Sequence, residues 1–367
     1  MRRLFLSLTL AGLALAAMTG GAAAASPSPQ GAVFTLSNSP AGNRVLVWER
    51  APNGALLAVG AVSTGGTGTG AGLGSQGALA LSGNHRWLYA VNPGSDEVSV
   101  FRVYGTHLQL MEVAPSGGDM PISITAHGEL VYVLNAGGDG NIQGFQRSAT
   151  GILQDIDGSN LPLSQPAPGP AQIEFAPNGR HLVVTEKATN RIDYYRVHAD
   201  GSASGPHWRA SAGQTPFGFE FSRNGTLVVS EAAGGAVDGS SASSYHFRPN
   251  GNLRLLDGPV ATTETAACWT AITRDGRFAY VTNNGSASIS GYSIGTNGDL
   301  TLLNSDGVTA TTGAGPIDIT FDFSSRHMYV LNAGSDTVTI FDVAADGSLT
   351  ADGWVPTPDG AAGLVAI

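Results

Sequence analysis

Short apolar segments alternate with turn residues along most of the chain, in a pattern that returns seven times. The clearest copy covers residues 326–343, RHMYVLNAGSDTVTIFDV, in which MYVL and TVTIFDV flank the turn sequence NAGSD. β-branched and aromatic residues on either side of a Gly/Asn/Asp turn predict an antiparallel β-hairpin. The other six copies cover residues 32–50, 86–103, 129–145, 180–197, 226–236 and 277–294.

Each hairpin belongs to a larger repeated unit. A strand and turn come before most copies, as in GPAQIEFAPNGR from Gly169, and a DG or NG turn with a further strand follows, as in DGSLTAD from Asp346. Equivalent positions recur every 43 to 54 residues. Four strands at this period predict an all-β, seven-bladed β-propeller of antiparallel blades. The first copy lacks its first strand, so we expect the C-terminal segment 360–367 to pair with the N-terminal strands and close the ring.

The N-terminal residues 1–25 differ from the repeats. Arg2 and Arg3 precede the apolar run LFLSLTLAGLALAAM, and small residues continue to Ala25. This order is typical of a secretory signal peptide, so we predict a secreted or periplasmic protein with one domain over residues 26–367. The sequence leaves open whether export uses the general secretory or the twin-arginine route. No later segment is long enough for a transmembrane helix.

The amino-acid composition limits the classes of partner that the protein can bind. The chain has 51 glycines, 13% charged residues and a formal net charge of −10, which disfavours nucleic acid and anionic membranes. The Gly-rich segment 63–77 lacks a P-loop pattern, so we interpret it as a mobile loop and expect no nucleotide. A single cysteine, Cys268, excludes an intrachain disulfide, and zinc and redox cofactor patterns are absent. We expect a monomer that takes a small-molecule substrate, with Cys268 as a buried small residue.

One position ends the second strand of every unit, and we call these seven residues the anchors. They are Asn38, Asn92, Asn135, Glu186, Glu231, Asn283 and Asn332. The blade geometry places them on the face where first strands begin, here named the anchor face, whereas the turns between first and second strands lie on the far face. Asn at a strand end commonly caps its own turn, although the anchor amides could also contact a substrate. Glu186 and Glu231 bring charge, and they could act as acid and base, hold a divalent cation or pair with an arginine such as Arg191.

Other candidates sort by the same geometry. Alignment on the anchors puts Ser123, Gln172, Gly218, Trp269 and Asp318 at equivalent first-strand positions facing the central channel. Gln172 and Asp318 could bind a polar substrate there, and Trp269 either forms a platform for a ring or plugs the channel. Arg209 precedes a first strand and is the best cationic candidate on the anchor face. His85, His181 and His327 fall on the far face, so no Ser/His/Asp triad can be assembled.

The repeats, with the segments TPFGFEF (215–221), VVSEAAGGA (228–236) and ACWTAITRDGRFAYVTN (267–283), make the chain resemble the secreted seven-bladed β-propeller lactonases, which are related to 6-phosphogluconolactonase and carboxymuconate cyclase. The resemblance implies hydrolysis of a small sugar or aromatic-acid lactone. Water would attack the ring carbonyl with Glu186 or Glu231 as base, and Arg209 or a bound cation would stabilise the oxyanion. Two alternatives stay open: a non-catalytic propeller that binds a protein, glycan or envelope component, and a lactonising isomerase of the muconate type.

Overall fold

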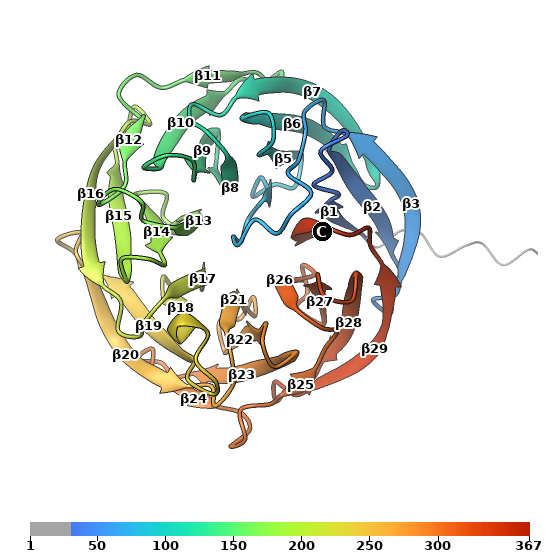
Figure 1. Cartoon of the computed structure of the whole chain (residues 1–367), viewed down its shortest axis with the longest axis vertical. Coiled ribbons are helices and arrows are strands. Elements are labelled where there is room, and N and C mark those ends of the chain that lie inside the picture. The colour runs from blue at the N-terminus through green and yellow to red at the C-terminus, as the bar shows by residue number, and fades with distance from the viewer. Residues whose placement is uncertain (1–30) are drawn as a thin grey trace, which may run out of the picture.

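The computed structural model describes residues 31–367, so the predicted signal peptide lies outside the described part. Seven β-sheets of four or five strands stand around a central axis (Figure 1). Each sheet is antiparallel, and its first strand lies nearest the axis except in blade 1, where the C-terminal strand takes that place. The predicted seven-bladed propeller is confirmed.

The blades follow the repeats in chain order. Blade 1 holds β1 (Gly31–Leu36), β2 (Arg44–Arg50), β3 (Leu56–Ser63) and β30 (Ala362–Ala366). Blade 2 holds β4 (Leu79–Leu81), β5 (Trp87–Asn92), β6 (Glu97–Tyr104) and β7 (His107–Pro115). Blade 3 holds β8 (Pro121–His127), β9 (Leu130–Asn135), β10 (Asn141–Arg147), β11 (Leu153–Asp155) and β12 (Leu161–Pro162). Blade 4 holds β13 (Pro170–Phe175), β14 (His181–Glu186), β15 (Arg191–Val197) and β16 (Ala203–Ala210).

The remaining blades repeat the plan. Blade 5 holds β17 (Pro216–Phe221), β18 (Leu227–Glu231), β19 (Ser241–Phe247) and β20 (Leu253–Ala261), with the 3-10 turn η1 (Ala233–Gly235) after β18. Blade 6 holds β21 (Ala267–Ile272), β22 (Phe278–Asn283), β23 (Ser288–Ile294), β24 (Leu300–Leu302) and β25 (Ala310–Thr311). Blade 7 holds β26 (Pro316–Phe321), β27 (His327–Asn332), β28 (Thr337–Val343) and β29 (Leu349–Pro356). Within residues 31–367 no helix is long and apolar enough to cross a membrane.

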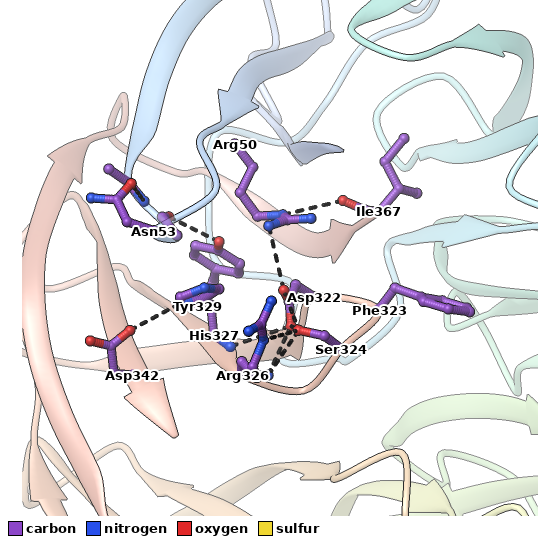
Figure 2. Close-up of polar contacts among 12 residues, drawn as sticks. Arg50, Asn53, Asp322, Phe323, Ser324, Arg326, His327, Tyr329, Asp342 and Ile367 are labelled. Carbon is purple, nitrogen blue, oxygen red and sulfur yellow. Dashed lines mark hydrogen bonds and ion pairs between the residues drawn. The ribbon is translucent and has the colours of Figure 1, made fainter. Parts of the chain in front are cut away.

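The ring closes as predicted. The C-terminal strand β30 pairs antiparallel with β1 and becomes the innermost strand of blade 1. The seam to blade 7 contains a buried ion pair between Arg50 and Asp322, with 3.4 Å between nitrogen and oxygen, and Arg50 also donates to the carbonyl of Ile367 (Figure 2). His327, predicted on the far face, is buried near this seam with its ring 2.9 Å from Asp342. Because β30 takes the innermost place in blade 1, β1 has no open sheet edge and blade 7 is covered at the seam.

The tyrosine of the repeat explains how adjacent blades stay in register. Tyr132, Tyr280 and Tyr329 are fully buried in second strands. Each hydroxyl donates to a glycine carbonyl in the turn between third and fourth strands of the next blade, at 2.8 to 2.9 Å. Those glycines belong to the DG and NG turns of the sequence pattern. A buried phenol needs such a partner, so the Tyr and the Gly of the repeat form one inter-blade contact.

Candidate functional site

The Gly-rich segment 64–77, which connects β3 to β4, reaches toward the centre of the ring (Figure 1). The side chain of Gln76 donates to the carbonyl of Thr270 at 2.8 Å and accepts from its amide at 3.1 Å, which makes a strand-like pair with blade 6. Ser75 donates to the carbonyl of Ile122 in blade 3 at 2.8 Å. The expectation of a mobile loop is therefore replaced by an ordered plug that joins blades across the axis.

Trp269 belongs to the plug contact. Its side chain is 4% exposed, and its indole N–H donates to the carbonyl of Ser75 at 2.9 Å. Of the two predicted roles, the structure supports channel filling, because a platform for a ring substrate would need an open face. The adjacent Cys268 is buried, as predicted, and burial raises the pKa of its thiol to about 12.

The polar first-strand residues tie neighbouring blades together. Gln172 in blade 4 accepts from the amide of Phe219 in blade 5 at 2.7 Å and donates to the carbonyl of Phe219 at 2.8 Å. Ser123 in blade 3 accepts from the amide of Ile173 in blade 4 at 3.1 Å. Asp318 is 2% exposed, and burial raises its pKa well above the usual value. These contacts occupy Gln172 and bury Asp318, so neither is available as the predicted substrate ligand.

The asparagine anchors bond other groups of the protein, three of them inside their own hairpins. All five are fully buried. The amides of Asn92, Asn283 and Asn332 donate to a hydroxyl of the third strand, at 2.7 to 2.9 Å. Asn135 donates to the carbonyl of Ser116, and Asn38 holds the plug through the amide and carbonyl groups of Thr69 and Ala71. The structural alternative thus accounts for the asparagines, and none faces a substrate.

Glu231 occupies the same buried position with no exposed surface. Its carboxylate accepts hydrogen bonds from the hydroxyls of Ser211 at 3.0 Å, Ser241 at 2.6 Å and Ser243 at 2.7 Å, and from the amide of Gly213 at 2.8 Å. A Cβ at Gly213 would lie 2.3 Å from this carboxylate, so the approach requires glycine. The expectation that Glu231 opens onto the channel mouth is wrong, because four donors enclose it.

Glu231→Gln is expected to lower the free energy of unfolding by about 1–3 kcal/mol, since an amide NH2 would face donors where the carboxylate accepts. Urea unfolding of the variant beside exposed Glu129→Gln would measure the difference. Equal stability of the two variants would show that the four contacts to Glu231 contribute nothing.

Glu186 is equally buried, between the hydroxyls of Ser164 and Thr189, and it accepts from the Ser164 amide at 2.9 Å. Arg191 donates to Ser164 at 3.0 Å and stacks on Trp208, so the predicted Arg191–Glu186 pair is absent from the ion pairs of residues 31–367. The predicted opening of Glu186 onto the channel mouth is therefore also wrong.

Asp193 stands where blades 2, 5, 6 and 7 have a third-strand hydroxyl, from Ser99, Ser243, Ser290 and Thr339. The side chain of Asp193 is fully buried beside Glu186. Neither of its carboxyl oxygens accepts a hydrogen bond from a serine hydroxyl, as the carboxylate of Glu231 does. Burial, then the hydrogen bond and charge of Glu186, raise the pKa of Asp193 to about 9. We therefore assign the shared proton of this carboxyl pair to Asp193 at neutral pH.

Asp193→Asn is expected to stabilise the fold at pH 7 by roughly 1–3 kcal/mol. The folded protein must protonate Asp193, whereas the unfolded chain ionises it at its ordinary pKa of 3.8. Stability from this group is therefore present in acid and is lost as pH rises toward 9. The gain should shrink toward pH 4 in melting curves, and exposed Asp299→Asn should show no such trend. A gain that is independent of pH would contradict the protonation.

Arg209 lies on β16, the outermost strand of blade 4. It donates to the carbonyl of Leu253 in blade 5 at 3.1 Å, and its guanidinium lies 5.6 Å from the ring centroid of Tyr245. Arg209, predicted as a cation of the anchor face, pairs with Ile192 near the anchor-face end of the blade but lies on the outermost strand, away from the axis.

Lys187 is the functional candidate that the sequence reasoning missed. It directly follows the anchor Glu186 and is half-buried at the anchor face. Its ammonium donates to the plug carbonyl of Gly74 at 2.6 Å and lies 4.6 Å from the ring centroid of Phe217. Burial lowers the pKa of Lys187 to about 8, and no carboxylate pairs with it among residues 31–367. The signal was available: Lys187 is the only lysine in the sequence.

This amine can act on a carbonyl group. As an ammonium it has donors left after the Gly74 contact, and as an amine it is a base near neutral pH. A divalent cation has no obvious place beside it, since residues 31–367 contain no group of three or more His, Cys, Asp or Glu side chains able to hold one. The site is a single partly desolvated amine between a plug and an aromatic ring.

The ring of seven antiparallel sheets makes the protein a seven-bladed β-propeller, and the family follows from comparison. The family model "Lactonase, 7-bladed beta-propeller" matches residues 41–168, 160–268 and 241–359. The chain therefore belongs to the seven-bladed β-propeller lactonase family.

Solved structures share the fold. A Lactobacillus plantarum protein superposes with a TM-score of 0.73 at 19% identity, covering 92% of this chain and 98% of that one. A putative 6-phosphogluconolactonase of Bacteroides uniformis gives 0.73 at 17%, covering 93% and 100%. The periplasmic gluconolactonase PpgL of Pseudomonas aeruginosa gives 0.68 at 17%, covering 91% and 99%. An uncharacterized Staphylococcus aureus (strain N315) protein is 33% identical over 89 residues, which span 23% of this chain and 26% of that protein.

Proposed function

We propose that the protein hydrolyses a small lactone at the anchor face, with Lys187 as the group that stabilises the developing oxyanion. Family membership supports lactone chemistry, and the observation that carries the assignment is the position of the chain's one lysine. Its ammonium is held against Gly74 and Phe217, and none of the ion pairs of residues 31–367 gives it a carboxylate partner. Such a charge in a poorly solvated place gains most from a neighbouring negative oxygen.

The step is simple. Water adds to the ring carbonyl carbon, and negative charge develops on the carbonyl oxygen beside the Lys187 ammonium. The ring C–O bond then breaks, the ring oxygen takes up a proton, and a hydroxy acid leaves. The buried Glu186 and Glu231 are not assigned the role of base, because hydroxyl and amide donors occupy them. A positively charged donor is sufficient for lactones, because their ring carbonyl is already reactive toward water.

Export to the periplasm or the medium is part of this proposal. It is supported by the leader pattern of residues 1–25, and the similarity to a Pseudomonas protein described as periplasmic is consistent with it.

The test is a panel of aldonolactones and aromatic-acid lactones, assayed by proton release with purified protein. We expect saturable hydrolysis above the buffer rate for at least one lactone. Inactivity toward the whole panel would reject the lactonase assignment and leave the binding module as the better reading. That alternative is itself favoured by one observation, the enclosure of both anchor carboxylates, Glu186 and Glu231, by hydroxyl and amide donors.

A further inference from the structure

A chain of recesses on the far face is lined by basic side chains. The one between blades 4 and 5 has a volume of about 570 Å³, and Arg180, His181, Arg196, His198 and His207 line it without any carboxylate. Arg180 and Arg196 enter no ion pair within residues 31–367. Burial and these two arginines lower the pKa of His181, which reports the positive field there.

The recess continues along the far face. It shares Arg180 and His181 with a second recess of about 420 Å³ that adds Arg248 and Arg254. That one shares Phe247 with a third of about 340 Å³.

The belt then reaches the far mouth of the central channel. The third recess meets Arg223, which also lines a recess of about 240 Å³ at that mouth together with Arg274. The last recess, about 550 Å³ between blades 6 and 7, adds Arg277 and Arg326. We call these five connected recesses the basic belt.

The belt contrasts with the whole molecule. Eight of the 18 Lys and Arg residues of a chain with net charge −10 line it. Of its three acidic side chains, Asp275 pairs with Arg277 at 2.7 Å and Asp322 pairs with Arg50 at 3.4 Å, which leaves Glu220. Like charges gathered this way repel one another and concentrate anions from solution. The belt is therefore built for a negatively charged partner longer than one recess.

The lining also provides flat faces and amides. The His181 ring stacks on Phe247 with centroids 4.1 Å apart and planes at 13°, and the Asn250 and Asn252 side chains border the same recess. Ring faces pack against sugar rings, and amides bond hydroxyl groups. Phe323 is the one large exposed aromatic in the belt, and Arg274 already covers it at 3.2 Å, so the belt offers few stacking sites for nucleic-acid bases.

We propose that the basic belt binds an acidic oligosaccharide, with carboxylate groups on the arginines and sugar rings over the recess between blades 4 and 5. This site is separate from the anchor face and goes beyond lactone hydrolysis. The surface would hold the protein on an acidic glycan while the opposite face stays open to small molecules.

The test uses the full-length mature protein and oligogalacturonate as the probe. Titration calorimetry in 50 mM salt should detect binding that weakens as salt rises and that neutral dextran does not reproduce. Arg180→Ser/Arg196→Ser should weaken binding by about tenfold or more, since each arginine loses charge-assisted hydrogen bonds. Arg44→Ser/Arg86→Ser removes the same charge outside the belt and should bind within twofold of wild type.

Three outcomes would overturn the proposal. They are no binding of oligogalacturonate at low salt, equal weakening by both double variants, and tighter binding of a single-stranded oligonucleotide of similar length. Melting curves of both variants guard against misfolding, and because the arginines are exposed they should match wild type.

Discussion

A chain ending at Pro358 is expected to lose its folded state altogether. The truncation removes β30, whose backbone pairs with β1 from Val33 to Leu36. It also removes buried Leu364 and Ala362 from the axis and leaves Arg50 without the carbonyl of Ile367. No other strand can take the innermost place in blade 1, so β1 would become an open inner edge.

Circular dichroism melting and size-exclusion chromatography measure this loss. We expect no cooperative transition and a tendency to aggregate in the truncated chain. Leu364→Ala is the graded version, with a cost of about 2–5 kcal/mol, and exposed Leu57→Ala is the matched control that should leave the melting temperature unchanged. A truncated chain that melts cooperatively at the wild-type temperature would contradict closure by β30.

Lys187→Met is expected to reduce lactone hydrolysis by about 100-fold, the usual effect of deleting an oxyanion donor. Lys187→Arg keeps the charge and should retain part of the activity. Above pH 8 the wild-type rate, corrected for hydroxide, should fall as the ammonium loses its proton. Arg44→Met keeps Lys187, so it should show the wild-type rate and the same fall above pH 8.

The same change should not weaken the fold. Burial holds the pKa of Lys187 at about 8, against its ordinary value of 10.5. The folded protein thus carries this charge at a cost below pH 8, and stability from this group rises between pH 8 and 10.5. At pH 7 the melting temperature of Lys187→Met should equal or exceed that of wild type. A fall in melting temperature that parallels the loss of activity would instead make Lys187 a structural residue.

The repeat pattern was sufficient to predict the blades and their closure. Hairpins depend on local turn chemistry, and three copies also carry the tyrosine whose hydroxyl contacts a turn glycine of the next blade, namely Tyr132, Tyr280 and Tyr329. Glu186 and Glu231 were harder, because a strand-end position indicates a face of the ring but not whether serine hydroxyls already enclose the side chain. Those serines come from other segments, such as Ser164 before β13 and Ser211 before β17.

The plug and the basic belt could not be predicted from the sequence for a similar reason. In the sequence, residues 64–77 look like a linker, because nothing nearby shows their hydrogen-bond partners. Those partners lie in other blades, up to 194 positions away along the chain. Net charge sums over the whole chain, so a net charge of −10 gives no sign that arginines gather on one face. Lys187 was missed because the reasoning looked at the anchor and not at the residue after it.

The most direct measurement of the central claim is an NMR titration of the protein with 13C-labelled lysine. Because the sequence has one lysine, the spectrum holds one Cε signal, from Lys187. The account predicts a pKa near 8 for the Lys187 amine, and a shift of its signal when a lactone that serves as substrate is added. A pKa near 10.5 that ignores every lactone would contradict it.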